Sequence, residues 1–224
     1  MPARLRPTAP IAAAAILVGD PGRALMLAQE LLEQPKMSNH ARGLWGYSGE
    51  TRAGEELSIQ ATGIGGPSAA VVLADLAELG VRRAVRVGTC TAISPELAPG
   101  MLLDVEEAHA WGGPGAGGGA PVQPDRALAR ALGRALGSDG RQGVVASLDV
   151  LHAGGVPPPV AEGDAVDMQT AALLGRGREL NVAVAAVLVV TESAGGSRTD
   201  DEEVAEAAKQ AGAAAAIALI STSG

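Results

Sequence analysis

Three arginines stand beside glycine-rich turns, and their side chains could bind an anion. Arg23, Arg42 and Arg86 lie in the segments Val-Gly-Asp-Pro-Gly-Arg, Arg-Gly-Leu-Trp-Gly-Tyr and Arg-Val-Gly-Thr, respectively. The 224-residue chain carries a net charge of -8, so arginines in such turns need a specific explanation. A guanidinium group binds a tetrahedral oxyanion in a fixed geometry, and glycine lets backbone N–H groups approach the same anion. These residues predict a site for a small anion, and we favour inorganic phosphate.

The turns fall where buried strands are expected to end. They begin at Gly19, Gly63, Gly88 and Thr191. Because ligands of doubly wound α/β folds bind outside the carboxyl ends of the strands, we expect the turns to converge on one site. Two alternatives stay open: Gly-Ile-Gly-Gly-Pro at residues 63–67 could be only a tight turn, and a single strand-end arginine is more often part of a surface ion pair. Three such arginines beside small-residue turns favour the binding site.

Other kinds of chemistry have little support in the sequence. The glycine turn at residues 63–67 lacks the G-x-G-x-x-G spacing of a dinucleotide site, and neither a G-x-x-x-x-G-K loop nor a G-x-S-x-G elbow occurs. His40, His109 and His152 lack the spacing of zinc ligands, so we expect no metal site. Cys90 could be a nucleophile, but nothing marks a partner base, and a small packing residue is the favoured interpretation.

Apolar segments typical of buried strands alternate with segments typical of helices. We expect strands at residues 12–18, 56–62, 83–87, 102–108, 143–148, 165–168 and 182–191, and helices at residues 23–32, 67–79, 124–136, 169–180 and 199–220. Asp20 could cap the first helix, and Thr199 with Glu202 fits a capping box for the last. This order predicts an α/β fold in which a central mixed or parallel β-sheet is flanked by helices, within a single domain over residues 1–224.

The composition restricts the partners of the chain. A net charge of -8 argues against a nucleic-acid-binding protein and against a polybasic membrane-surface protein. The single cysteine excludes a disulfide framework within the chain and fits a reducing compartment. The apolar run at residues 10–18 is short, so we expect a buried strand rather than a signal peptide, no membrane span, and a cytoplasmic location. Gly- and Pro-rich segments at residues 111–121 and 154–159 are expected to be surface loops, with a lid as the alternative.

These motifs resemble the nucleoside phosphorylase superfamily, in the branch of hexameric bacterial purine nucleoside phosphorylases and uridine phosphorylases. The resemblance covers most of the chain and is strongest in Gly-Asp-Pro-Gly-Arg at residues 19–23, Asn39 with Arg-Gly-Leu-Trp-Gly-Tyr-Ser-Gly at residues 42–49, Thr-Gly-Ile-Gly-Gly-Pro-Ser at residues 62–68, and Val-Arg-Val-Gly-Thr at residues 85–89. Asp-Met-Gln at residues 167–169 is similar to the family's Glu-Met-Glu, and Val-Thr-Glu at residues 190–192 to its Val-Ser-Asp or Val-Ser-Asn. The resemblance implies a nucleoside phosphorylase-like fold.

The resemblance also implies a reaction, the reversible phosphorolysis of a ribonucleoside to free base and ribose 1-phosphate. Inorganic phosphate is then a co-substrate and no cofactor is needed. Gly19, Arg23, Arg86 and Thr89 match the phosphate ligands of the family, and Arg42 would reach the phosphate of a neighbouring subunit. The implied partners are therefore a nucleoside, phosphate and further copies of the chain, with a dimer as the minimal active unit and a trimer of dimers as the usual assembly.

Matching positions imply the nucleoside contacts as well. Met168 would pack under the ribose, Asp167 and Gln169 would face its hydroxyls, and the base would be surrounded by Cys90, Thr91, Thr191 and Glu192. The catalytic residues implied are Arg86, which would orient the phosphate beside a cation-like sugar, and Glu192, which could protonate a purine N7 as the base leaves. Glu192 must be protonated for that step, and burial would favour the protonated form. The alternative is that Glu192 is a solvated carboxylate on a loop and takes no part in the reaction.

Several departures keep the substrate open. Asp167 and Gln169 replace glutamates of the family, so we expect the ribose to be bound more weakly. Gln169→Glu should then raise nucleoside affinity or turnover. Leu151 replaces an aromatic residue, and the uracil-reading Gln/Arg pair is missing after His152. A purine nucleoside phosphorylase is favoured by the possible acid Glu192 and by the absence of the uracil-reading Gln/Arg pair. A uridine, pyrimidine or modified-nucleoside phosphorylase is favoured by the uridine phosphorylase-like residues 62–68. A non-catalytic phosphate- or nucleoside-binding relative is the third possibility, and a hydrolase, which does not need the arginines, ranks below these.

Overall fold

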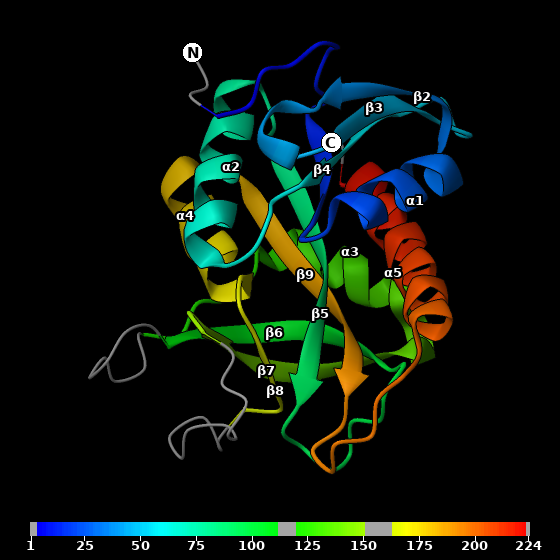
Figure 1. Ribbon diagram of the computed structural model, residues 1–224. Coiled ribbons are helices and arrows are strands. Elements are labelled where there is room, and N and C mark those ends of the chain that lie inside the picture. The colour runs from blue at the N-terminus through cyan, green and yellow to red at the C-terminus, as the bar shows by residue number, and fades with distance from the viewer. Residues whose placement is uncertain (1–3, 112–119, 151–162, 223–224) are drawn as a thin grey trace.

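The structure, a computed structural model, describes residues 4–111, 120–150 and 163–222 (Figure 1). Within these residues a nine-stranded sheet is flanked by five α-helices. Leu151, His152 and nearly all of the two segments considered as lids lie outside them.

The sheet and the helices have the following bounds. The strands are β1 (Ala14–Val18), β2 (Leu32–Asn39), β3 (Gly46–Thr51), β4 (Glu56–Ala61), β5 (Arg83–Ala92), β6 (Leu102–Trp111), β7 (Gly140–Leu148), β8 (Ala165–Asp167) and β9 (Ala183–Glu192). The helices are α1 (Pro21–Leu31), α2 (Gly66–Glu78), α3 (Arg126–Leu136), α4 (Thr170–Leu180) and α5 (Asp201–Ser221), with short 3-10 turns η1 (Ala41–Gly43) and η2 (Gly137–Asp139). Every strand and helix expected from the sequence is present, and the α/β fold with a mixed sheet is confirmed.

The topology brings the predicted turns together. The strand order is β2-β3-β4-β1-β5-β8-β7-β6-β9, and β9 also pairs with β5, so the last five strands of that order close on themselves. The strand β1 runs parallel to β4 and β5, with Val18 opposite Ala61 and Leu17 opposite Arg86. The end of β1 therefore lies beside the middle of β5, and the end of β4 lies next to the end of β1.

Helices cover both faces of the sheet, as Figure 1 shows: α1, α3 and α5 on one face, α2 and α4 on the other. The alternation of side chains along each strand divides the core accordingly. In β1, Ile16 and Val18 join the cluster under α1 and α5, whereas Ala15 and Leu17 join the cluster under α2 and α4. Both faces of β1 are buried, which explains why its sequence is apolar throughout rather than alternating.

The strands β2 and β3 were not expected from the sequence, and β2 does not have a strand-like sequence. Its residues Leu-Glu-Gln-Pro-Lys-Met-Ser-Asn show no regular alternation and include Pro35. Proline is tolerated because β2 is the edge strand, and its pairing with β3 is irregular between Glu33 and Lys36, where Gln34 has a φ of 47°. The chain passes from α1 directly into this strand without a loop.

Three further expectations about local structure were wrong. Residues 88–91 continue β5 instead of forming a turn, and β5 pairs with β8 over Thr91 and Ala92. Thr191 and Glu192, expected in a turn, are the last two residues of β9. The cap of α5 is Asp200, whose side chain accepts a hydrogen bond from the N–H of Glu203 (2.8 Å), so the capping box predicted from Thr199 is displaced by one residue. The cap of α1 is Asp20, as expected: its Oδ1 lies 2.7 Å from the backbone nitrogen of Arg23.

One buried carboxyl makes the stability of the fold depend on pH. Asp104 on β6 lies under α3, where a Cβ on Gly133 would be 3.0 Å from its Oδ2. Burial, together with the negative charge of Glu106, raises the pKa of Asp104 from 3.8 to about 6. Because the folded-state pKa is the higher one, folding favours the protonated acid. The stabilisation of the folded state by protonated Asp104 is complete below the pKa that this residue has in the unfolded chain. It is lost as the pH rises through about 6.

We therefore expect Asp104→Asn to stabilise the protein at high pH. The side chain shares a cleft of about 940 Å³ with Arg126 and Arg130, so screening reduces the effect to about 1–2 kcal/mol at about pH 8. Near pH 4 the variant and the wild type should unfold at the same temperature. Thermal unfolding at both pH values measures this, with Glu30→Gln on the exposed face of α1 as the control. An equal shift at the two pH values would contradict the assignment.

Candidate active site

A cavity of about 380 Å³ opens where β1 and β4 end beside β5 and β8. All but two of the residues predicted to bind phosphate or nucleoside line it: Gly19, Arg23, Arg86, Thr89, Cys90, Thr91, Asp167, Met168, Gln169 and Thr191. The glycine turn before α2 lines it as well, through Gly63, Ile64 and Gly65. The two exceptions are Arg42 and Glu192. The structure thus brings together residues from five separate segments of the sequence.

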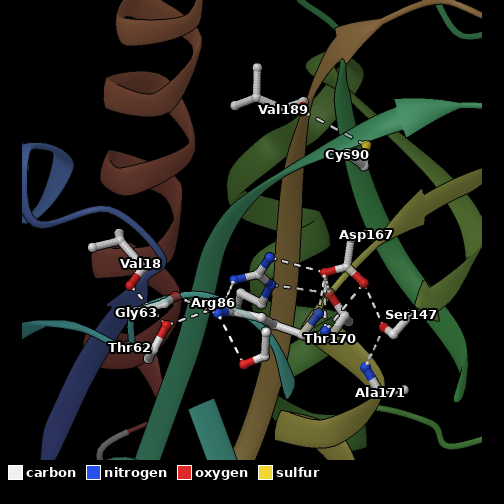
Figure 2. Close-up of polar contacts among 12 residues, drawn as sticks. Val18, Thr62, Gly63, Arg86, Cys90, Ser147, Asp167, Thr170, Ala171 and Val189 are labelled. Atoms are coloured by element: carbon white, nitrogen blue, oxygen red, sulfur yellow. Dashed lines mark hydrogen bonds and ion pairs between the residues drawn. The ribbon is translucent and has the colours of Figure 1, made fainter. Parts of the chain in front are cut away.

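Arg86 is held firmly by three acceptors (Figure 2). Its side chain is only 6% exposed, and its Nε, Nη1 and Nη2 donate to Thr170 Oγ1 (3.1 Å), Gln169 Oε1 (2.7 Å) and Asp167 Oδ2 (3.0 Å). A guanidinium group has five N–H donors, so two donors of Arg86 remain, and these have no acceptor within residues 4–111, 120–150 and 163–222. The group is therefore fixed in orientation and still able to bind an anion in the cavity.

Gly88 makes room for this guanidinium. A Cβ on Gly88 would lie 2.5 Å from Cζ and Nη2 of Arg86 and 2.7 Å from Leu188 on the adjacent strand. Any side chain here would displace Arg86 from its acceptors. The glycine that suggested a turn in the sequence is therefore a packing requirement within a strand.

Asp167 is the counterion of Arg86 and is enclosed by donors. Its carboxylate accepts hydrogen bonds from the hydroxyls of Ser147 and Thr170 and from the backbone N–H groups of Gln169 and Thr170, in addition to the ion pair (Figure 2). Its side chain has no exposed surface. Contact with a sugar hydroxyl, the role predicted from the sequence, would require some of these bonds to break.

Gln169 uses all of its hydrogen-bonding capacity within the protein. Its Oε1 accepts from Arg86 and from the hydroxyl of Thr62 (3.1 Å), and its Nε2 donates to the carbonyls of Gly63 (2.6 Å) and Gly65 (3.4 Å). The side chain is buried. The amide thus links the arginine to the glycine turn before α2, and only an amide, which both donates and accepts, can make this set of bonds.

Arg23 is the second guanidinium in the cavity and has no side-chain partner in the described part of the chain. It lies in the first turn of α1, whose N-terminal N–H groups also favour an anion. Burial lowers the pKa of Arg23, Asp20 opposes that shift, and the positive charge of Arg86 adds to it. Arginine stays protonated all the same. Two neighbouring guanidinium groups, one of them unpaired and partly desolvated, form a site that a doubly charged anion would stabilise.

The remaining polar groups of the cavity are hydroxyls from β5 and β9. Thr89 and Thr91 have partly exposed side chains without a hydrogen-bond partner among the described residues, and Thr191 donates to the carbonyl of Cys90 (3.1 Å). Burial raises the pKa of the Cys90 thiol, as does the charge of Asp167, while Arg86 opposes them. The thiol stays protonated and points to the carbonyl of Val189 (3.8 Å, Figure 2), which supports a packing role over a nucleophilic one.

Of the two predicted residues outside the cavity, Glu192 is partly exposed and Arg42 is exposed. Glu192, at the end of β9, is an ion-paired carboxylate: its Oε2 accepts from Nε (3.0 Å) and Nη2 (2.8 Å) of Arg198, and its side chain is 29% exposed. It directly follows Thr191, which lines the cavity. Arg42 lies on the exposed turn η1 and does not reach the cavity of its own chain.

Sequence reasoning missed three residues that organise this site. Thr170 and Ser147 bind Asp167, and Arg198 binds Glu192. The signal for Thr170 was present, because it directly follows Asp-Met-Gln at the start of an expected helix. Ser147 lies on β7, and only the pairing of β7 with β8 brings it beside Asp167.

The described residues limit other kinds of site. Within residues 4–111, 120–150 and 163–222, no three His, Cys, Asp or Glu side chains are grouped so that they could hold a metal ion. Over the same ranges, each helix is too short or too polar to cross a membrane.

Comparison with known proteins identifies the family. A family model described as the phosphorylase superfamily matches residues 13–222. The DeoD-type purine nucleoside phosphorylase of Oceanobacillus iheyensis is 43% identical over 83 residues, 37% of this chain and 35% of that protein. The DeoD-type enzyme of Geobacillus kaustophilus is 42% identical over 91 residues, 40% of this chain and 38% of that protein. The matched part of the chain thus spans little more than a third of the length of these curated relatives.

Solved structures show the same fold at lower identity. Purine nucleoside phosphorylase from Toxoplasma gondii, in complex with immucillin-H, superposes with a TM-score of 0.81 at 22% identity and covers 93% of this chain and 90% of its own. Uridine phosphorylase from Vibrio fischeri superposes with a TM-score of 0.84 at 21% identity and covers 95% of this chain and 93% of its own. The resemblance seen in the sequence is confirmed: because the family model spans nearly the whole chain, this protein belongs to the phosphorylase superfamily, and its fold is that of the nucleoside phosphorylases.

Proposed function

We propose that the protein cleaves the N-glycosidic bond of purine ribonucleosides with inorganic phosphate, giving free base and ribose 1-phosphate. The observation that carries the proposal is the pair Arg23 and Arg86 in one cavity, one guanidinium unpaired and the other with two free donors. Family membership supports the reaction class. No cofactor takes part, and phosphate is the co-substrate.

Phosphate would be bound mainly by groups on α1 and β5. Arg23 and Arg86 supply charge, Thr89 supplies a hydroxyl, and Gly19 lets the backbone at the start of α1 come close. Because Arg86 is already oriented by three acceptors, little reorganisation is needed when phosphate binds. The bound dianion then stabilises positive charge that develops on the sugar as the glycosidic bond breaks.

The nucleoside would occupy the part of the cavity between β5, β8 and β9. Met168 would pack against the ribose, and Cys90, Thr91 and Thr191 would surround the base. We propose that Asp167 and Gln169 serve the sugar indirectly, because they hold Arg86 and the glycine turn in place.

Glu192 is proposed as the general acid for the leaving base. It follows Thr191 at the rim of the cavity, and a purine N7 could take a proton from it. For this step Arg198, whose side chain is 75% exposed, must release the carboxylate, so that a proton can replace the ion pair.

Arg42 is proposed to complete the phosphate site of a neighbouring copy. Its exposed position on η1 fits this role, and a homodimer is then the smallest active unit, with a trimer of dimers as the expected assembly. We further propose that residues 1–224 form one domain and that the enzyme works in the cytoplasm, in the salvage of nucleosides.

A second candidate is a phosphorylase of uridine or another pyrimidine or modified nucleoside. The fold similarity to the Vibrio fischeri uridine phosphorylase and the uridine-like residues 62–68 favour it. A non-catalytic phosphate- or nucleoside-binding relative is the third, favoured by the internal bonds of Asp167 and Gln169.

A substrate panel separates these candidates. With saturating phosphate, base release from inosine, guanosine, adenosine and uridine is followed by chromatography. We expect release from purine nucleosides. Release from uridine alone would replace the first proposal by the second. Phosphate binding by calorimetry without turnover of any member would leave the non-catalytic relative.

A further inference from the structure

The loop that carries Arg42 connects β2 and β3 (Figure 1). Its backbone conformation is one that its sequence does not favour. Arg42 has φ 61° and ψ 20°, in the left-handed region, and Gly43 follows with φ 71°. An L-residue other than glycine is disfavoured there by contact of its Cβ with the backbone. Such strain persists only where surrounding contacts enforce it, and it is concentrated at functional positions.

Two buried amide side chains hold this loop. Asn39, at the end of β2, donates from Nδ2 to the carbonyls of Ala41 (3.4 Å) and Leu44. Gln60, on β4, donates from Nε2 to the carbonyls of Leu44 (2.9 Å) and Trp45 (3.4 Å). The carbonyl of Leu44 is thus bound from both sides, and carbonyls on both sides of Arg42 are fixed.

The amides are themselves anchored in the fold. Asn39 is 0% exposed and accepts a hydrogen bond on Oδ1 from the N–H of Arg6 (2.8 Å). Gln60 is 1% exposed and also donates to the carbonyl of Ala61 (2.9 Å). Gly46 leaves the space that Gln60 needs, because a Cβ there would be only 2.3 Å from Oε1. The two amides, which we call the clamp, are therefore part of the rigid sheet. Arg42, by contrast, is exposed and has no side-chain partner in the described part of the chain.

We infer that Asn39 and Gln60 are positioning residues that preset the backbone of Arg42 for the phosphate site of a second copy. The inference rests on the proposed function, in which Arg42 crosses to its neighbour. A mobile arginine loop would lose conformational freedom on binding phosphate, and a preset loop avoids much of that loss. The clamp explains why a strained backbone is retained at an exposed arginine.

The test compares phosphate KM in variants of the whole protein. Gln60→Leu keeps the size of the side chain and removes its donor. We expect phosphate KM to rise about tenfold while nucleoside KM stays within about twofold, since two of the three lost bonds hold the arginine loop and the third is to Ala61 on the same strand. Ser58→Ala is the matched control. Ser58 is equally buried on the same strand and bonds to Ala12 and Ser48, not to the loop, so its phosphate KM should be unchanged.

A double variant separates positioning from general destabilisation. If Gln60 acts through Arg42, adding Arg42→Ala to Gln60→Leu should raise phosphate KM no further than Arg42→Ala alone. Arg42→Gly relieves the left-handed strain, so it should raise the unfolding temperature while raising phosphate KM. Should Gln60→Leu fail to fold, Asn39→Ala replaces it with the same expectations.

The outcomes distinguish the inference from the function on which it rests. A raised phosphate KM for Arg42→Ala, together with an unchanged one for folded Gln60→Leu and Asn39→Ala, overturns the inference alone. Additive effects of Gln60→Leu and Arg42→Ala overturn it as well. An unchanged phosphate KM for Arg42→Ala overturns both the role of Arg42 in the proposed function and the inference.

Discussion

Replacing Arg86 with alanine is expected to abolish phosphate-dependent base release and to lower the free energy of unfolding by about 3–5 kcal/mol. The catalytic loss follows from its position, since Arg86 is the oriented guanidinium of the cavity, with two donors free. The stability loss follows from Asp167, which would keep a buried negative charge without its counterion. Steady-state kinetics with varied phosphate and denaturant unfolding measure the two effects separately.

A paired variant separates the two roles of Arg86. Arg86→Met with Asp167→Asn removes both charges, so most of the lost stability should return, while activity should not. Near-normal phosphorolysis by Arg86→Ala would show that the cavity does not bind phosphate as proposed. Recovery of phosphate dependence in the double variant would show that the charge of Arg86 is needed only for folding.

The second large effect is expected from Gln169→Glu, and its direction is the reverse of the one that the sequence suggested. Glutamate cannot donate to the carbonyls of Gly63 and Gly65, so its carboxylate oxygen would face a carbonyl where the amide now donates over 2.6 Å. We expect the free energy of unfolding to fall by about 1–3 kcal/mol, because a buried bond is replaced by repulsion. The phosphate KM should rise, because the new carboxylate would compete with Asp167 for Arg86.

Thr62→Val is the matched control for this variant. It removes the hydroxyl that donates to Gln169 Oε1 and to the carbonyl of Val18, and it keeps the bonds of Gln169 to both glycine carbonyls and to Arg86. It should therefore change phosphate KM much less than Gln169→Glu does. A fall in nucleoside KM or a rise in turnover for Gln169→Glu would contradict the structural account, because it would mean that a carboxylate at this position reaches the sugar.

The sequence was sufficient to predict the α/β fold and the convergence of the turns, because both depend on strong local patterns. The buried strand β1 is apolar along its whole length and β9 is apolar up to Val190, and strand ends of this fold class meet at one place. β2 could not be predicted, because an edge strand with a proline and an irregular pairing has no distinctive pattern.

The residues of the site were easier to predict than their contacts. The motifs named Arg86, Asp167 and Gln169, but the bonds among them depend on β5, β8 and the turn before α2 meeting in space. Sequence patterns show that a side chain is present and do not show which partners use its donors and acceptors. For the same reason, the ion pair of Glu192 with Arg198 could not be predicted from the sequence. The two residues are six positions apart and pair across a short β-bridge.

The most direct test of the proposed reaction is base release with and without phosphate. The purified protein is incubated with inosine in phosphate and in phosphate-free buffer, and hypoxanthine and the pentose product are both quantified. The account predicts hypoxanthine only when phosphate is present, with one ribose 1-phosphate for each base. Equal release in the absence of phosphate, with free ribose as the product, would contradict it.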